Sequence, residues 1–287
     1  METGYVRKPE WLKTRLRGNE QFRRTKRIVE SHGLHTICTS GKCPNRSECW
    51  SCGTATFLIG GEVCTRSCRF CHTPTGRPGP LDPAEPAHVA ESIRLMGLKH
   101  AVITSVDRDD LPDLGARHWV ETIRCIRTLN PQTTLEVLIP DFQGRMERVD
   151  EVIAAAPEII SHNLETVRRL TPQIRSAARY ETSLAVLSRV ASRGVHAKTG
   201  IMAGLGETAD EVEALMDDAL HAGVSILTIG QYLQPSRKNI PVAEYVSPQQ
   251  FERYRRLALS KGFRQVESAP PVRSSYRAGM VDMTQHT

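Results

Sequence analysis

The chain has 287 residues, of which 39% are hydrophobic and 24% are charged, and its formal net charge is +6. This length suits one large α/β domain with a substantial core. No apolar run approaches the roughly 18 residues of a membrane span, and the first residues lack a signal-peptide pattern. We therefore expect a soluble protein of a reducing compartment, with no membrane partner.

Residues 1–53 are predicted to form an N-terminal extension that is rich in positive charge. The basic side chains are Lys13, Arg15, Arg17, Arg23, Arg24, Lys26 and Arg27. Such a run is either a solvated helical face or a surface for an acidic partner. Aromatic residues make up only 5% of the chain, which disfavours stacking on single-stranded nucleic acid. We favour an acidic protein as the partner and expect no nucleic acid.

Residues 54–262 show strand-like runs that alternate with helical periodicity. The strands are predicted at 54–59, 101–105, 135–139, 158–161, 195–201 and 225–229. The helices are predicted at 85–97, 116–129, 145–156, 183–193, 208–221 and 248–261. Six such units in series predict a parallel sheet with helices outside, in a partial (β/α)6 TIM-type barrel. A doubly wound open sheet is the alternative, because strand order is not visible in the sequence. Residues 263–287 are predicted to be a tail that closes the barrel mouth.

Polar or glycine-bearing loops follow the predicted strands. Examples are Asp107–Asp110, His162–Glu165 and Gly204–Gly206. Because parallel α/β folds place their sites at the C-terminal ends of strands, we expect these loops to converge on one mouth. Each loop, taken alone, is equally compatible with a helix cap or a turn.

Seven of the eight cysteines lie between Cys38 and Cys71. They form two groups, Cys38-x4-Cys43-x5-Cys49, with Cys52 three residues further on, and Cys64-x3-Cys68-x2-Cys71. Three cysteines on a tight loop suit three irons of a 4Fe–4S cluster and leave the fourth iron open to another ligand. The spacing thus favours two clusters, each completed by something else.

Two other uses of these cysteines compete. Cys49/Cys52 and Cys68/Cys71 have the C-x2-C spacing of a structural zinc site, which would leave the remaining cysteines unused. Disulfides are the second alternative, although they are typical of small secreted proteins. Cys125 stands alone in a helical pattern and is predicted to be a small core residue.

The group Cys64-x3-Cys68-x2-Cys71 follows the first predicted strand, and Phe70 precedes its last cysteine. This combination resembles the radical S-adenosylmethionine (SAM) enzymes. The resemblance implies that the three cysteines hold a 4Fe–4S cluster whose open iron binds SAM. Reductive cleavage of SAM then gives a 5′-deoxyadenosyl radical, which removes hydrogen from an unactivated carbon.

Further motifs resemble the lipoyl synthase family, over about residues 11–276. They are the Cys38 group with its Asn45, residues 53–57, 103–110, 162–166, 204–208 and 230–236, and the terminal Arg273-Ser274-Ser275-Tyr276. The resemblance implies insertion of two sulfur atoms, at carbons six and eight of an octanoyl-lysine on an acidic lipoyl carrier domain. It assigns no role to Cys52, for which a free buried thiol is the alternative.

The same resemblance implies a division of roles between the cysteine groups. Cys64, Cys68 and Cys71 would hold the SAM cluster. Cys38, Cys43 and Cys49 would hold an auxiliary 4Fe–4S cluster that donates its sulfides, with a serine of the tail on its fourth iron. The family pattern points to Ser275, and spacing alone does not separate it from Ser274. A serine alkoxide is a harder ligand than a thiolate, which suits a cluster that must be dismantled.

The SAM contacts expected from the loops are Asn163, Glu165, Gly204, Gly206, Asp107, Lys198 and Gln234. Loop scaffolding is the alternative for each. Arg273 is expected to anchor either the tail or the backbone of the carrier.

The implied carriers are the acyltransferase subunits of 2-oxoacid dehydrogenases and the glycine cleavage H protein, with ferredoxin or flavodoxin as electron donor. The location expected is the bacterial cytoplasm, or the mitochondrial matrix for a mature eukaryotic form. The alternatives are another radical SAM sulfur-inserting enzyme of the biotin synthase type and a zinc-stabilised nucleic-acid-binding module.

Overall fold

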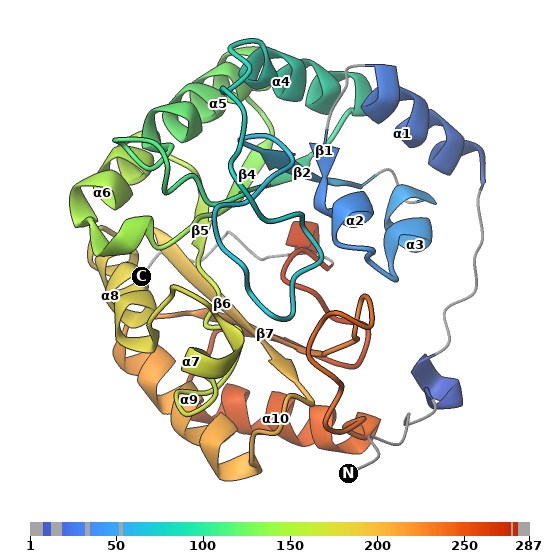
Figure 1. Cartoon of the computed structure of the whole chain (residues 1–287), viewed down its shortest axis with the longest axis vertical. Helices are drawn as coiled ribbons and strands as arrows, with labels where there is room; N and C mark the ends of the chain where they lie inside the picture. Colours follow the sequence, from blue (N-terminus) through green and yellow to red (C-terminus); the bar gives the residue numbers. More distant parts are fainter. Residues whose placement is uncertain (1–7, 13–18, 32–34, 52–53, 277, 281–287) are drawn as a thin grey trace.

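A single eight-stranded sheet forms the centre of the computed structural model, with helices around its outside (Figure 1). The structure describes residues 8–12, 19–31, 35–51, 54–276 and 278–280. The strands are β1 (His35–Thr36), β2 (Thr56–Ile59), β3 (His100–Ser105), β4 (Thr134–Leu138), β5 (Ile159–Ser161), β6 (His196–Ala203), β7 (Ile226–Gln231) and β8 (Gln265–Ser268).

The strands lie side by side in chain order, from β1 to β8. Strands β2 to β8 are parallel to their neighbours, and β1 pairs antiparallel with β2. Within the described residues, β8 does not pair with β1, so the barrel is open on one side. The prediction of a partial barrel with six strand–helix units is confirmed. The doubly wound alternative is wrong, because that fold reverses its strand order at a switch point.

The six predicted parallel strands are near-continuous apolar runs because both of their faces are covered. All four residues of β2 and all six of β7 are buried. Strands β1 and β8 were not predicted. Strand β1 has only two residues, and β8 alternates half-buried and buried positions within the segment expected to be a tail.

The helices of the outer layer follow the parallel strands around the barrel (Figure 1). They are α4 (Glu85–Met96), α5 (Ala116–Leu129), α6 (Met146–Ala154), α8 (Tyr180–Ser192), α9 (Ala209–His221) and α10 (Pro248–Lys261), with a short α7 (Thr171–Ile174) before α8. Local sequence defines their ends. Helix α9 starts with a capping box between Thr208 and Glu211, and α10 ends at Gly262 in the left-handed conformation.

The N-terminal part adds α1 (Glu20–Ser31), α2 (Ile37–Ser40) and α3 (Arg46–Ser51) beside β1 and β2 (Figure 1). Short 3-10 turns occur at Glu10–Leu12, Phe142–Gly144 and Ala278–Met280. No helix within the described residues is long and apolar enough to cross a membrane.

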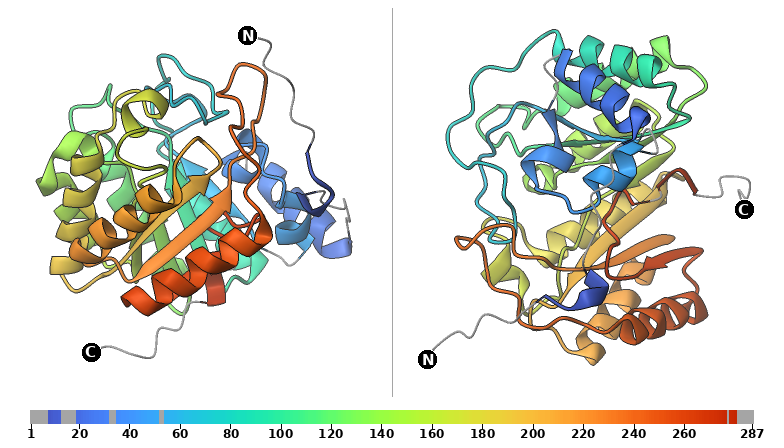
Figure 2. Two further views of the ribbon diagram at one scale, coloured as in Figure 1. Left: turned by 90° about the horizontal axis from the view of Figure 1, so that it is seen from below. Right: turned by 90° about the vertical axis from the view of Figure 1, so that its right-hand side faces the viewer.

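Two long loops project from the same end of the barrel (Figure 2). One is the segment 60–84 after β2, which contains the second cysteine group, and the other is the segment 232–247 after β7. This is the end at which the parallel strands finish, so the loops surround the mouth where a site is expected.

Candidate active site

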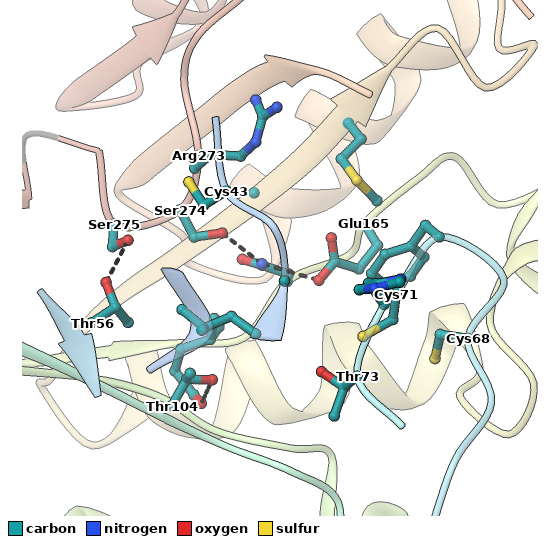
Figure 3. A pocket seen from close by; sticks show the side chains of 18 of the residues that line it. Cys43, Thr56, Cys68, Cys71, Thr73, Thr104, Glu165, Arg273, Ser274 and Ser275 are labelled. Carbon is teal, nitrogen blue, oxygen red and sulfur yellow. Dashed lines mark hydrogen bonds between the residues drawn. The ribbon is translucent and has the colours of Figure 1, made fainter. Parts of the chain in front are cut away.

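A cavity of about 530 Å³ occupies the barrel interior and opens among these loops. This volume lies within the usual range for small-molecule sites. Its walls come from both cysteine segments, from the strands β2, β3, β4, β6 and β7, from residues that follow β5 and from residues 272–275 near the C-terminus. Figure 3 shows Cys68 and Cys71 on one side, Cys43 with Ser274 and Ser275 on the other, and Glu165 between them.

Cys64, Cys68 and Cys71 all line the cavity. The loop turns tightly at its end, where the Cys71 amide donates to the Cys68 carbonyl at 3.0 Å. The Cys64 sulfur accepts hydrogen bonds from the backbone amides of Arg66, at 3.4 Å, and Asp107, at 3.3 Å. Hydrogen bonds to ligating sulfurs are one of the factors that set the potential of an iron–sulfur cluster. The structure therefore brings together the three cysteines predicted for the SAM cluster.

Arg66 anchors this loop, and the sequence analysis missed it. Its guanidinium donates to Asp109, at 2.6 and 2.9 Å, and to Asp141, at 2.7 Å. The side chain is only 5% exposed and also lies 3.3 Å from a carboxylate oxygen of Asp107. These carboxylates follow β3 and β4, so the cluster loop is tied to two strand ends. The sequence did offer a signal for this role of Arg66. Arg66 is a cation between Cys64 and Cys68, and the acidic run at 107–110 could pair with it.

Cys38, Cys43 and Cys49 form the first cysteine group, on α2, the following loop and α3. The Cys43 amide donates to the Cys38 carbonyl at 3.2 Å. Cys38 and Cys43 line the cavity, whereas Cys49 is not among its lining residues. Burial raises the pKa of the Cys49 thiol to about 12, and the charges of Cys38 and Cys43 add to the effect. The three sulfurs are therefore electrostatic neighbours.

The thiols of both groups fit metal-bound cysteines. Burial raises the pKa of Cys64 to about 12 and of Cys68 to about 11, so these groups are neutral thiols without a cation. Binding to iron deprotonates a thiol outright and supplies the missing positive charge. Each group provides three sulfurs for a four-iron cluster, which leaves one iron of each cluster for another ligand.

The alternative uses of the cysteines do not agree with this geometry. The seven described cysteines are all free, so the disulfide alternative fails for them. In the described parts of the chain, no three His, Cys, Asp or Glu side chains are arranged to hold one metal ion, and this search leaves out Cys52 of the zinc alternative. Cys49 neighbours Cys38 and Cys43 rather than the second group. Cys52, which the zinc alternative needs, lies outside the described residues, as do Lys13, Arg15 and Arg17.

Residues 270–276 run along the inner side of the barrel from β7 to β2. The Gln231 amide donates to the Pro270 carbonyl at 3.2 Å, and Thr56 on β2 donates to the Ser275 hydroxyl at 2.8 Å. The Ser274 hydroxyl accepts from the Asn163 amide at 2.7 Å, so the two serines face different partners (Figure 3). Both serines line the cavity.

Four of the predicted SAM contacts line the cavity, namely Asn163, Glu165, Asp107 and Gln234. Asn163 is buried and donates to Glu165 at 3.0 Å, while its own carbonyl oxygen has no hydrogen-bond partner. Burial raises the pKa of the Glu165 carboxyl, and Arg175 opposes the shift. The backbone of Glu165 has φ +66°, a strained conformation for a residue other than glycine that clusters at functional sites. The Asn163 Oδ1, which is buried and has no hydrogen-bond partner, and the neighbouring Glu165 side chain together fit a polar ligand.

The other three, Lys198, Gly204 and Gly206, do not line the cavity. Lys198 is buried and pairs with Glu136, with nitrogen–oxygen distances of 2.7 and 2.9 Å, so its charge is neutralised inside the barrel wall. Gly204 has φ +96°, and a Cβ there would lie 2.3 Å from the Glu244 carbonyl oxygen. A side chain at Gly204 would collide with neighbouring protein atoms, which accounts for the glycine without SAM. The sequence analysis had instead expected this glycine to let SAM approach the backbone.

Comparison with known proteins identifies the family. Residues 58–219 match the model of the radical SAM superfamily. Two solved structures share the fold, at too low an identity to indicate more: Streptococcus suis SuiB bound to S-adenosylmethionine (TM-score 0.59, 9% identity, 78% of this chain and 54% of that chain) and methylornithine synthase PylB (TM-score 0.53, 11% identity, 92% and 84%).

Curated relatives extend over almost the whole chain. Lipoyl synthase of Parabacteroides distasonis is 76% identical over 96% of this chain and 98% of its own length. The chain belongs to the lipoyl synthase family. The lipoyl synthase of Treponema denticola is 56% identical over 95% of this chain and 94% of its own length. The resemblance drawn from the cysteine groups and the Arg-Ser-Ser-Tyr motif is confirmed.

In this member of the lipoyl synthase family, the structure places Cys125, Gly200 and Gly230 differently from what the sequence indicated. Cys125 is half-buried at the edge of the core on α5, where its thiol contacts Glu121 at 3.7 Å, so the prediction of a core residue was too strong. Gly200 and Gly230 line the cavity from strand interiors; Gly200 was not predicted, and Gly230 was named only as the first residue of the motif 230–236. Glycine inside a strand often marks the close approach of another backbone or a ligand, and that was the available signal.

Proposed function

We propose that this protein inserts two sulfur atoms, at carbons six and eight of a protein-bound octanoyl-lysine, to give the lipoyl cofactor. The observation that supports this most directly is a single cavity lined by Cys38 and Cys43 of the first group, by all three cysteines of the second group and by both tail serines. A 4Fe–4S cluster on Cys64, Cys68 and Cys71 with SAM supplies radical hydrogen abstraction when bound. Conversion of an octanoyl-lysyl peptide by the anaerobic enzyme tests the proposal.

The side chains between the two cysteine groups would position SAM. The unpartnered Asn163 Oδ1 can accept a hydrogen bond from an amino or hydroxyl group. The Glu165 carboxylate, which accepts from the Asn163 Nδ2 at 3.0 Å, can hold a cation beside it. Asp107 and Gln234 line the same cavity. Asn163 also binds Ser274, so the proposed SAM side is linked directly to the tail.

The first cysteine group, Cys38, Cys43 and Cys49, is proposed to hold the auxiliary 4Fe–4S cluster as the sulfur source. Iron and acid-labile sulfide analysis after anaerobic purification tests this, with about eight irons per chain expected for two clusters. Zinc without sulfide would instead support the nucleic-acid-binding alternative. The biotin-synthase-like alternative is disfavoured by the family and by the presence of the Cys38 group.

Ser275 is proposed to be the fourth protein ligand of the auxiliary cluster. Thr56 donates its hydroxyl to Ser275 at 2.8 Å, and the Thr56 backbone also donates to Cys38 and lowers the pKa of that thiol against the stronger raising effect of burial. Ser275 is thus close to the first cysteine of the group. Ser274 instead bonds to Asn163, on the proposed SAM side.

We predict that Ser275→Cys retains a full complement of iron but loses sulfur insertion by roughly 10- to 100-fold, because a thiolate holds iron more firmly than an alkoxide does. The measurements are iron per chain and sulfur-containing product per turnover. Normal turnover would contradict the idea. Loss of iron in Ser274→Ala, with iron retained in Ser275→Ala, would transfer the ligand role to Ser274.

The carrier is proposed to dock on a basic rim, defined here as Arg69, Arg237 and Lys238. These exposed residues lie on the two mouth loops. Asn239 joins the loops by donating to the carbonyls of Arg69, at 3.2 Å, and Cys71, at 2.7 Å. The rim therefore lies directly beside the second cysteine group and is complementary to an acidic domain.

The proposed carriers are octanoylated lipoyl domains of 2-oxoacid dehydrogenase acyltransferase subunits and the glycine cleavage H protein, and the proposed electron donor is ferredoxin or flavodoxin. We predict that Arg237→Glu with Lys238→Glu lowers kcat/KM for an octanoylated carrier domain by about tenfold at low salt. Activity on a short octanoyl-lysyl peptide should be unchanged, because the peptide lacks the acidic surface.

The matched control is Arg124→Glu with Arg253→Glu, which makes the same charge change at exposed positions on the outer helices α5 and α10. The rim effect should shrink as salt screens the charges, and the control should show little effect. Equal losses on the peptide and on the carrier domain would mean that the substitutions damage the cavity rather than docking.

A further inference from the structure

The C-terminal segment passes over β7 at a glycine that has no room for a side chain. A Cβ on Gly230 would lie 1.9 Å from the Val272 carbonyl oxygen and 2.8 Å from the Val272 carbonyl carbon. Contacts below 3.0 Å between a Cβ and backbone are essentially never seen, so the backbone would have to move. Gly230 does not have a positive φ, so its backbone would accept any residue. Space for the crossing segment, rather than backbone freedom, requires glycine here.

Asn45 holds the same segment through a hydrogen bond to its backbone. Its side-chain amide donates to the Pro271 carbonyl at 2.6 Å, a contact between residues 226 positions apart. Asn45 is 2% exposed and lies between Cys43 and Cys49, and its carbonyl accepts from the Cys49 amide at 2.9 Å. The segment is thus clamped between β7 and the first cysteine group, directly before the two serines.

The clamp fixes where the serines point. Directly after Val272 the chain continues through Arg273 to Ser274 and Ser275, which bond to Asn163 and Thr56. A Cβ on Gly200, in the neighbouring strand β6, would lie 3.4 Å from the Ser274 hydroxyl, which is ordinary contact, and 2.4 Å from the Thr228 hydroxyl, so Ser274 passes close to this strand. A shift of the backbone at 272 would therefore displace both hydroxyls.

We infer that Gly230 and Asn45 form a seat, meaning a pair of contacts that fixes the position of residues 270–276. This seat places Ser275 where it can bind the auxiliary cluster. Both are positioning residues, because they act through the segment and not on the reacting atoms. The inference rests on the proposed function in one respect, the role of the serine as a cluster ligand. The seat itself is a property of the chain without any cluster.

The test is Gly230→Ala, with Gly79→Ala as the matched control. Gly79 also has no positive φ, and nothing lies within 4 Å of a Cβ built there, so the same added methyl group meets no neighbour. In the apoprotein, amide hydrogen exchange over residues 270–276 should be faster in Gly230→Ala by at least about tenfold, and unchanged in Gly79→Ala. After reconstitution, Gly230→Ala should hold about half of the wild-type iron.

A second variant keeps the inference testable if Gly230→Ala does not fold. Asn45→Asp has the same size but removes the donor to Pro271, so it should speed exchange over the same residues without adding volume. SAM cleavage to 5′-deoxyadenosine should continue in both variants and become uncoupled from sulfur insertion.

Unchanged exchange in both variants would overturn the seat. Faster exchange with full iron would overturn the delivery of the serine to the cluster. A wild-type protein with only about four irons would instead contradict the proposed auxiliary cluster, whatever the exchange experiment shows. The two failures are therefore distinguishable.

Discussion

Replacing Cys68 with alanine is expected to abolish SAM cleavage, with less than about one hundredth of wild-type 5′-deoxyadenosine formed. The group offers three sulfurs, and two cannot hold a four-iron cluster with an iron left open for SAM. The loop should otherwise keep its path, because the Arg69 amide donates to the Ile174 carbonyl at 2.8 Å and the Ser67 amide to the Ser176 hydroxyl at 3.0 Å.

The measurements for Cys68→Ala are 5′-deoxyadenosine by chromatography and iron per chain, which should fall by about half. Cys125→Ala is the control, since Cys125 lies on α5 in the outer layer and should leave both quantities unchanged. Persistent SAM cleavage in Cys68→Ala would show that this group does not carry the SAM cluster.

Replacing Cys43 with alanine is expected to give the complementary result. SAM cleavage should continue, because the second cysteine group is intact, while sulfur insertion falls by at least about a hundredfold. Cys43 lines the cavity opposite Cys68 and Cys71, on the side of the tail serines (Figure 3). Loss of this ligand is expected to remove the proposed sulfur source without touching the residues proposed to bind SAM.

The measurement for Cys43→Ala is the ratio of 5′-deoxyadenosine to sulfur-containing product, which should rise sharply relative to the wild type. Equal loss of both products would mean that the two cysteine groups form one functional unit. Retained sulfur insertion would exclude the Cys38 group as the sulfur source.

The fold was largely predictable because the parallel strands are buried on both faces. Strands such as β2 and β7 have only buried residues, and such apolar runs stand out against the helical periodicity between them. Strand β8 has only alternating burial, and β1 has two residues, so neither carries a clear local pattern. Strand order is a property of pairing, which only the structure shows.

The candidate site was predictable where chemistry is local in sequence. The spacing within each cysteine group indicates how many sulfur ligands one loop can provide to an iron–sulfur cluster. What the sequence could not indicate is which side chains meet across long separations. The bond between Asn45 and Pro271 and the space beside Gly230 both depend on the path of the C-terminal segment through the barrel. Lys198 is a further example, because the sequence does not show that it pairs with Glu136, 62 positions away.

Anaerobic incubation of the reconstituted enzyme with SAM, a strong reductant and an octanoyl-lysyl peptide tests the central claim most directly. The expected result is 5′-deoxyadenosine together with a peptide whose mass has increased by two sulfur atoms. Formation of 5′-deoxyadenosine with the octanoyl-lysyl peptide unchanged would contradict the assignment of the substrate and of the Cys38 group as sulfur source, and would leave only the radical SAM chemistry of the second group.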